Sequence, residues 1–164
     1  MTVTRSDPAL QTALRRAMGN LTTGLCVVTT SSGGGRPHGT TLRGVMSLSM
    51  DPPMVLLSLS RTSSLLARLS RGGQFGVNVL AAHHDQIALR FSRDVHDRFA
   101  DIAWEDAGAP RLHDVHAWVL ADVASLVPAG DHTLVLGDVV EAEAAGGRPL
   151  AYWQRTFGTH QACW

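Results

Sequence analysis

The chain has 164 residues, of which 45% are hydrophobic and 17% charged, a composition typical of one globular domain and unlike that of a disordered segment. Basic and acidic residues balance at 14 each, so no net field attracts nucleic acid or anionic lipid, and we expect neither as a partner. All basic residues are arginine, which excludes a Schiff-base lysine, a Walker lysine and a Ser-Lys dyad.

The two cysteines, Cys26 and Cys163, form no C-x-x-C pair, which argues against a zinc knuckle or a dithiol redox site. The first ten residues lack the apolar core of a secretion signal, and nowhere do eighteen apolar residues run together. We therefore expect a cytoplasmic protein with a single domain over residues 1–164 and no membrane partner.

The first predicted element is a helix. Asp7 is a suitable N-cap, Pro8 suits the first turn, and the helix ends near Gly19-Asn20. Its apolar stripe consists of Leu10, Leu14, Met18 and Leu21. Four extended segments follow, and the predicted strands are 25–30, a stretch from Pro37, 45–49 and 54–59. A glycine-rich turn at 31–35 separates the first two strands, and Asp51-Pro52-Pro53 separates the last two.

The second half alternates short helices and strands. Helices are predicted at 61–71 and 83–91, a strand at 75–80, a long polar loop at 92–111, two long strands at 117–126 and 133–143 joined by the turn 128–131, and a last strand at 150–157. Six or seven strands, joined largely in sequence, with three short helices predict a mainly β protein. The expected fold is a closed antiparallel barrel with the helices outside.

Several common sites are absent. Eight histidines invite a metal hypothesis, but His113 and His116 would point to opposite faces of a strand, and there is no H-E-x-x-H. We expect no bound metal. G-x-S-x-G is missing, and Gly33-Gly34-Gly35 does not complete G-x-G-x-x-G, so neither a hydrolase elbow nor a Rossmann nucleotide site is predicted.

Two polar groupings are candidate binding residues. One is rich in hydroxyl groups and includes a helix N-terminus with an arginine, which could hold an anion or serve only as an N-cap; its members are Thr40, Thr41, Ser47, Ser49 and Arg61-Thr62-Ser63-Ser64. The other is Gly130-Asp131-His132, where glycine and aspartate suit a turn. His132 at the start of a long strand is either a core histidine or a group that faces a ligand.

In order along the chain, these segments resemble the flavin reductase-like family, the small reductase partners of two-component flavin-dependent monooxygenases. The resemblance covers nearly the whole chain and rests on the ordered set of motifs rather than on one of them. The matching segments are 14–19, 23–30, 38–41, 47–53, 75–80, 90–92, 130–133 and 137–139.

The resemblance implies a Greek-key-type split β-barrel that forms a homodimer and binds FMN or FAD. It implies that NADH or NADPH passes a hydride directly to the flavin, and that the reduced flavin diffuses to a separate oxygenase. Such a protein would supply stacking and alignment rather than a covalent catalyst.

The resemblance also assigns candidate residues. His132 would contact the nicotinamide and is the candidate catalytic residue. The isoalloxazine ring would be lined by Thr41, Leu42, Arg43, Gly44, Val45 and Ser47. The phosphate would meet Ser63 and Ser64, with Arg61 beside them, and Phe91 and Ser92 would lie against the ribityl or phosphate end.

The segment Arg43-Gly44-Val45 departs from the family, which has a small polar residue and then an aromatic there. Arg43 would either approach the pyrimidine edge of the ring or point outward. This departure keeps one alternative open beside the reductase, an oxidase or monooxygenase with tightly bound flavin that acts on its own substrate. A second alternative, supported only by the histidines, is a carrier of flavin or haem without catalysis.

Overall fold

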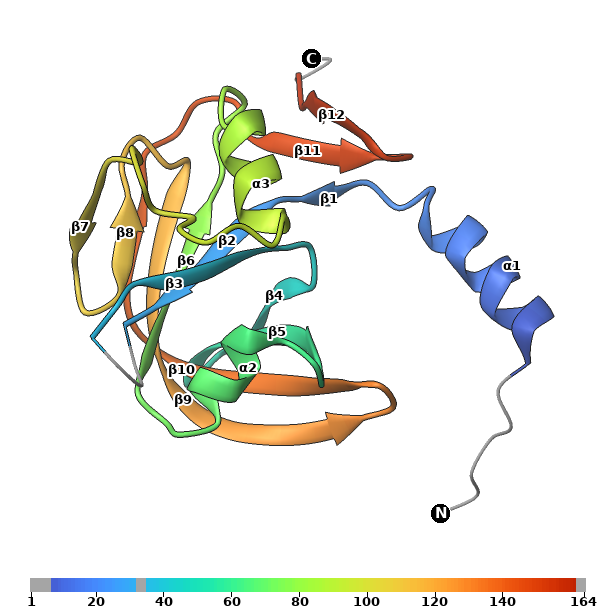
Figure 1. The fold of residues 1–164 in the computed structure, drawn as a ribbon, viewed down its shortest axis with the longest axis horizontal. Helices are drawn as coiled ribbons and strands as arrows, with labels where there is room; N and C mark the ends of the chain where they lie inside the picture. The colour runs from blue at the N-terminus through green and yellow to red at the C-terminus, as the bar shows by residue number, and fades with distance from the viewer. Residues whose placement is uncertain (1–6, 32–34, 162–164) are drawn as a thin grey trace.

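The computed structural model describes residues 7–31 and 35–161. The middle of the predicted turn at 31–35 and Cys163 lie outside the described residues. The fold is mainly β with three short helices, as predicted (Figure 1). The helices are α1 (Pro8–Met18), α2 (Ser64–Leu69) and α3 (Asp85–Ser92). The strands are β1 (Thr23–Gly24), β2 (Cys26–Thr30), β3 (His38–Leu42), β4 (Val45–Met50), β5 (Pro53–Ser60), β6 (Gln74–Val79), β7 (Trp104–Asp106), β8 (Pro110–Leu112), β9 (Ala117–Ala129), β10 (His132–Ala144), β11 (Leu150–Trp153) and β12 (Thr156–Thr159).

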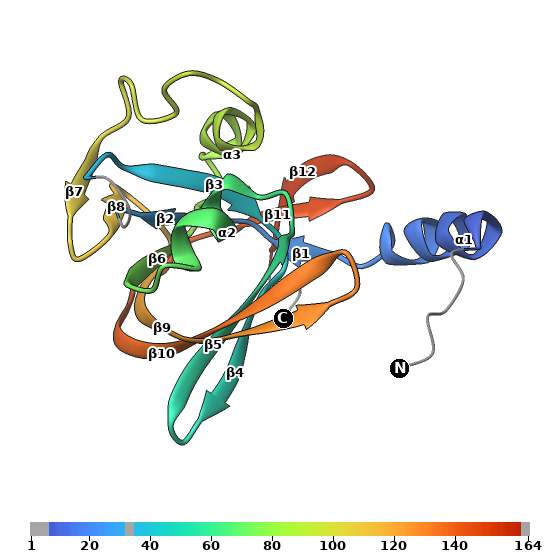
Figure 2. The ribbon, with the colours of Figure 1, turned by 60° about the horizontal axis from the view of Figure 1, so that its bottom comes forward.

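The main sheet has seven strands in the order β3-β2-β6-β9-β10-β5-β4, and every pairing in it is antiparallel. It curls round on itself (Figure 2), helped by two register shifts in the long β9–β10 hairpin. The expected closed barrel is wrong, because β3 and β4 are edge strands that share no hydrogen-bonded ladder. They are nevertheless consecutive in the chain, so the two-residue link Arg43-Gly44 brings the two edges together at one corner.

The sheet separates two hydrophobic cores. Successive residues of β2 point to opposite faces, so Val27 enters one core and Val28 the other. The first core lies between the sheet, α3 and the segment that follows it, and includes Phe91 and Trp118. The second fills the inside of the curl against α2. Gly76 lies directly beneath Trp118, where a Cβ would come 2.1 Å from the indole, so no larger residue fits at that position.

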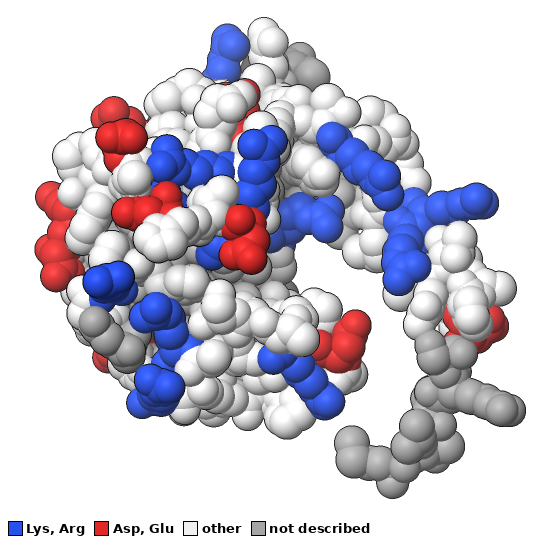
Figure 3. Space-filling model, viewed as in Figure 1, with Lys and Arg blue, Asp and Glu red and all other residues white. Residues whose placement is uncertain are grey.

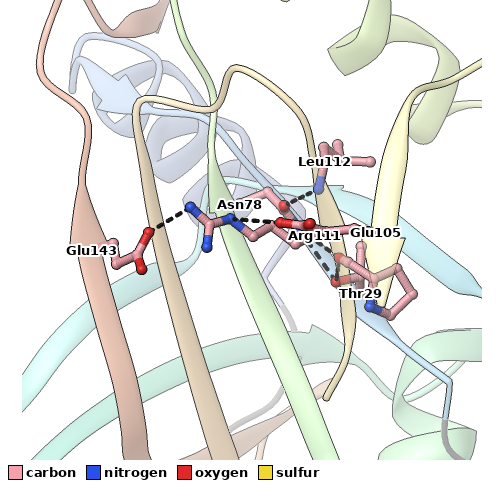
Figure 4. Close-up of polar contacts among 7 residues, drawn as sticks. Thr29, Asn78, Glu105, Arg111, Leu112 and Glu143 are labelled. Atoms are coloured by element: carbon pink, nitrogen blue, oxygen red, sulfur yellow. Dashed lines mark hydrogen bonds and ion pairs between the residues drawn. The ribbon is translucent and has the colours of Figure 1, made fainter. Parts of the chain in front are cut away.

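The segment 92–111, predicted to be a polar loop, contains the small β7–β8 sheet. Its anchor is the buried side chain of Asn78 on β6 (Figure 4). The Asn78 Oδ1 accepts a hydrogen bond from the Leu112 N–H at 2.7 Å, and its Nδ2 donates to the Pro110 carbonyl at 3.3 Å and the Val27 carbonyl at 3.1 Å. Sequence periodicity did not reveal this sheet because its strands have only three residues each.

The predicted last strand is a hairpin, β11–β12, and β11 pairs with β1. Helix α1 begins as predicted, with the Asp7 carboxylate accepting the Ala9 N–H at 2.9 Å, but it buries none of its residues and projects away from the sheet (Figure 1). It meets the hairpin tip at Gln154, whose N–H donates to the Gly19 carbonyl and whose Nε2 donates to Asn20 Oδ1 at 2.9 Å. None of the helices in the described part of the chain has the length and apolar character needed to cross a membrane.

Candidate functional site

A pocket of about 500 Å³ lies at the corner where the two edges of the sheet meet. We call it the central pocket. Its walls come from the end of β3, the link Arg43-Gly44, β5, α3, the start of β10 and the β11–β12 hairpin. The link is held in place because the Gly44 carbonyl accepts the Ser58 N–H at 2.8 Å. A Cβ on Gly44 would lie 3.1 Å from the Ser58 Cβ, so this position favours glycine for its close approach to β5.

A second pocket of about 550 Å³ adjoins the central pocket and shares Leu42, Ser58 and His132 with it. We call it the hydroxyl pocket, because six of its lining residues carry a hydroxyl group: Thr40, Ser58, Ser60, Thr62, Ser63 and Ser64. Its one guanidinium belongs to Arg98, which donates hydrogen bonds to the carbonyls of Gly39 and Arg93, each at 2.9 Å. The carboxylate of Asp94 also lines this pocket, so the hydroxyls beside the fixed guanidinium are the groups that suit a phosphate.

Some hydroxyls of this pocket also have structural partners. Ser63 caps α2 by accepting the Leu66 N–H at 3.4 Å, which is the N-cap role considered for it from the sequence. The Ser64 Oγ lies 3.0 Å from Nε2 of His38. Burial, with Arg68 and Arg98 nearby, lowers the pKa of His38 to about 4. The ring is therefore neutral at pH 7 and can exchange a hydrogen bond with Ser64.

His132 stands between the two pockets, so it faces the proposed site rather than the core. Its Nδ1 lies 2.7 Å from Oδ1 of Asp131, and this hydrogen bond is the main cause of a lowered pKa for the exposed Asp131 carboxyl. Within residues 7–31 and 35–161, no hydroxyl group is hydrogen-bonded to His132. The Asp131-His132 pair is therefore not part of a hydrolase triad.

The central pocket has the chemistry of a site for a flat ring rather than of an acid-base site. Its walls include the apolar side chains of Leu25, Leu89 and Phe157, and no carboxylate lines it. Arg43 is one of its lining residues, with the guanidinium 5.1 Å from the centroid of the Tyr152 ring. Arg43 thus lies at the edge of the pocket instead of pointing away from it.

The structure brings together most of the predicted site residues. The central pocket contains Thr41, Leu42, Arg43, Gly44, Ser92 and His132. The hydroxyl pocket contains Ser63, Ser64, Leu42 and His132. Thr41 Oγ1 donates to the Ala88 carbonyl at 2.7 Å, and this bond ties β3 to α3.

Four predicted residues lie outside the linings of both pockets. Phe91 is fully buried in the first core, edge-on to Phe99. Val45 packs against the second core, and Ser47 is exposed on the edge strand β4. Arg61 is exposed beside Asp131 rather than beside the serines, so Arg98 takes the place that was expected for it.

Sequence reasoning missed Ser58, Arg98, Tyr152 and Arg155. Arg98 lies in the segment taken for a polar loop, and Tyr152 and Arg155 reach the pocket because β11 pairs with the distant β1. No local pattern signals such long-range contacts. Only the alternation along β5 could have placed Ser58 on the same face as Ser60.

Known proteins resemble this chain in both sequence and structure. A family model described as "Flavin reductase like domain" matches residues 18–161. A "Flavin reductase (NADPH)" from Lentzea aerocolonigenes is 40% identical over 147 residues, covering 87% of this chain and 86% of that protein. The solved structure of a Streptomyces globisporus NADH:FAD oxidoreductase, in complex with NAD and FAD fragments, has a TM-score of 0.86 at 30% identity and covers 98% of each chain.

Other relatives are longer. The reductase component of a flavin-dependent trigonelline monooxygenase from Acinetobacter baylyi is 34% identical over 148 residues, which cover 89% of this chain but only 48% of that protein. The chain likewise spans about half, 49%, of a "Probable flavin reductase" from Rhizobium meliloti. The shared part is in each case the domain whose pockets are described above. With the family model matching residues 18–161 and a relative of similar length at 40% identity, this chain belongs to the flavin reductase-like family.

Proposed function

We propose that this chain is an NAD(P)H:flavin oxidoreductase. It reduces FMN or FAD by direct hydride transfer and releases the reduced flavin to a separate flavin-dependent oxygenase. The observation that carries the proposal is the continuity between the central pocket and the hydroxyl pocket. A flat ring with a phosphate-bearing tail needs this combination of an apolar chamber and an adjoining anion site.

The residues fit a flavin in the following way. Ser63, Ser64 and Arg98 would hold the phosphate. The end of β3, with Arg43 and Gly44, would lie along the ring, and His132 would stand where the nicotinamide meets it. When both ligands are bound, the nicotinamide gives up a hydride with its two electrons, and the flavin accepts it together with a proton from solvent.

The protein's part in this reaction is alignment. Hydride transfer between two aligned rings needs no general base, and no carboxylate of the described residues lines the central pocket. The guanidinium of Arg43 supplies positive charge at the pocket mouth, which stabilises negative charge on a reduced ring. The relative named as a reductase component of a monooxygenase supports the assignment of a separate oxygenase as partner.

The proposal includes a homodimer, a split barrel and a cytoplasmic location. A second copy would cover the apolar surface that this chain leaves exposed on α1 and on the edge strand β4, because soluble monomers rarely expose surface of this kind. These side chains include Leu10 and Leu14 on α1 and Met46, Leu48 and Met50 on β4. Sedimentation equilibrium is expected to give twice the chain mass, and Leu10→Ser with Leu14→Ser is expected to lower it.

The test of the enzymatic proposal is anaerobic mixing of the purified protein with excess FMN or FAD and with NADH or NADPH. Loss of flavin absorbance for many flavins per protein would establish a diffusible-flavin reductase. The alternative with its own substrate would be supported by tightly bound, stoichiometric flavin that neither nicotinamide reduces. That second result would overturn the reductase.

A further inference from the structure

A third recess, of about 920 Å³, lies between α1 and the β11–β12 hairpin. We call it the arginine cleft, because Arg15, Arg16, Arg43 and Arg155 line it. Among the residues that the structure describes, no aspartate or glutamate lines it. The chain as a whole is neutral, so the cleft is a local concentration of positive charge. Figure 3 shows basic side chains on both sides of the gap between α1 and the rest of the molecule.

The guanidinium groups of the cleft are available to a ligand. Among the described residues, no carboxylate forms an ion pair with Arg15, Arg16 or Arg155. Arg43 is oriented by the Tyr152 ring, which is neutral and leaves its charge uncompensated. An uncompensated group of arginines suits a phosphate group, because each guanidinium can donate two parallel hydrogen bonds to its oxygens and several together match its multiple charge.

The walls of the cleft are held together at the hairpin tip. Gln154 binds Gly19 and Asn20 at the end of α1, so the helix that carries Arg15 and Arg16 is tied to the strand that precedes Arg155. Gln154 and Arg155 both have positive φ values, 46° and 65°. Two-residue turns of this type favour asparagine and glycine. In this chain the two positions carry Gln154, which is hydrogen-bonded to the end of α1, and Arg155, which lines the cleft.

The position of the cleft indicates its ligand. It shares Arg43, Tyr152 and Arg155 with the central pocket, while the hydroxyl pocket joins the central pocket through a different set, Leu42, Ser58 and His132. The central pocket is therefore flanked by two recesses that carry groups able to bind anions, the hydroxyl pocket and the arginine cleft. The hydroxyl pocket, with one arginine, suits the flavin phosphate. The arginine cleft is then left for the phosphates of the second reactant.

We infer that the arginine cleft binds the phosphate groups of the nicotinamide dinucleotide and selects NADPH over NADH. This inference rests on the proposed reductase function. The pyrophosphate common to both donors carries about two negative charges, and the 2′-phosphate of NADPH adds about 1.5 to 2 more at pH 7. Arg15, Arg16 and Arg155 approach this larger charge, with Arg43 shared between the cleft and the central pocket. With NADH, part of the positive charge would remain unpaired.

The test compares Arg15→Ala/Arg16→Ala and Arg155→Gly with wild type. Glycine suits the positive φ of residue 155, so this variant should fold, and its melting temperature checks that it does. Arg71→Ala, at an exposed position that lines none of the three pockets, is the matched control for loss of a surface charge. Steady-state flavin reduction is measured anaerobically at saturating FMN with each donor.

Wild type is expected to show a kcat/KM for NADPH at least about 10-fold above that for NADH, since charge-assisted contacts to one phosphate are worth roughly that factor or more. Each cleft variant should lower this ratio by about 10-fold, mainly through the KM for NADPH, and Arg71→Ala should leave it unchanged. Equal use of the two donors by wild type and variants would overturn the inference while leaving the reductase function intact.

Two further measurements separate the remaining outcomes. Calorimetric titration with adenosine 2′,5′-bisphosphate needs no turnover, so weaker binding by the cleft variants would support the cleft even if no flavin were reduced. Comparison of FAD with FMN in the same variants identifies the bound phosphate. A loss confined to FAD would show that the cleft holds the adenylate part of the flavin, and the inference would be wrong.

Discussion

The guanidinium of Arg43 lies over the ring of Tyr152, 5.1 Å from its centroid. Arg43 belongs to the short link between the two edge strands of the main sheet, and Tyr152 belongs to β11 of a separate sheet. The pair therefore fastens the C-terminal hairpin to the corner of the main sheet. It also holds a positive charge at the boundary between the central pocket and the arginine cleft.

Replacing Tyr152 tests this relationship. A cation–π contact at a partly exposed site is worth about 0.5–2 kcal/mol, so Tyr152→Ala should raise the KM for flavin by about 5-fold. Tyr152→Phe keeps the ring and should stay within about 2-fold of wild type. Steady-state kinetics at saturating nicotinamide provide the measurement, and equal values for the two variants would contradict the role assigned to the ring.

His132 lines both the central pocket and the hydroxyl pocket. His132→Ala should lower kcat/KM for flavin reduction by about 10-fold, because a positioned contact at the reacting centre is lost. Asp131→Asn keeps a side chain that can bond to Nδ1 and should have a smaller effect. Stopped-flow reduction under anaerobic conditions measures both, and an unchanged rate in His132→Ala would remove this residue from the mechanism.

Asn78 should be a main determinant of stability. Asn78→Ala leaves the buried Leu112 N–H without its acceptor and removes one donor each from the Pro110 and Val27 carbonyls, at a cost of about 2–4 kcal/mol. The melting temperature should fall by roughly 5–12 °C. The exposed amide of Gln86 offers the control, since Gln86→Ala should change the free energy of unfolding by less than about 0.5 kcal/mol. Equal melting temperatures for the two variants would refute the proposed anchor.

His38 should make stability depend on pH. In the folded chain its pKa is lowered from 6.5 to about 4 by burial and by Arg68 and Arg98. As the pH falls from 6.5, the unfolded chain takes up the proton first, so the free energy of unfolding decreases down to about pH 4. His38→Gln cannot titrate. Urea unfolding of both proteins from pH 7 to 4 should therefore show wild type losing more stability than the variant, and parallel curves would disprove the assignment.

Much of the sheet was predictable because its strands carry a local signal. The β-branched stretch at 25–30 and the apolar run at 54–59 became β2 and β5 within one residue at each end. His132 was identified because a histidine that follows a Gly-Asp turn is unusual at the start of a long strand. Phe91 was misplaced for the opposite reason: an aromatic next to Ser92 fits a core as well as it fits a ligand, and only the packing against Phe99 distinguishes them.

By itself, the sequence determined the mainly β fold, the N-caps of α1 and α2 and the family. These features depend on periodicity, turn residues and motif order, all of which are local. The tertiary structure alone decided that the sheet stays open at β3 and β4, that Arg98 replaces Arg61, and that Tyr152 and Arg155 complete the site. Each of these depends on which distant segments pair, and that choice is made by the free energy of the whole packed chain rather than by any short stretch of it.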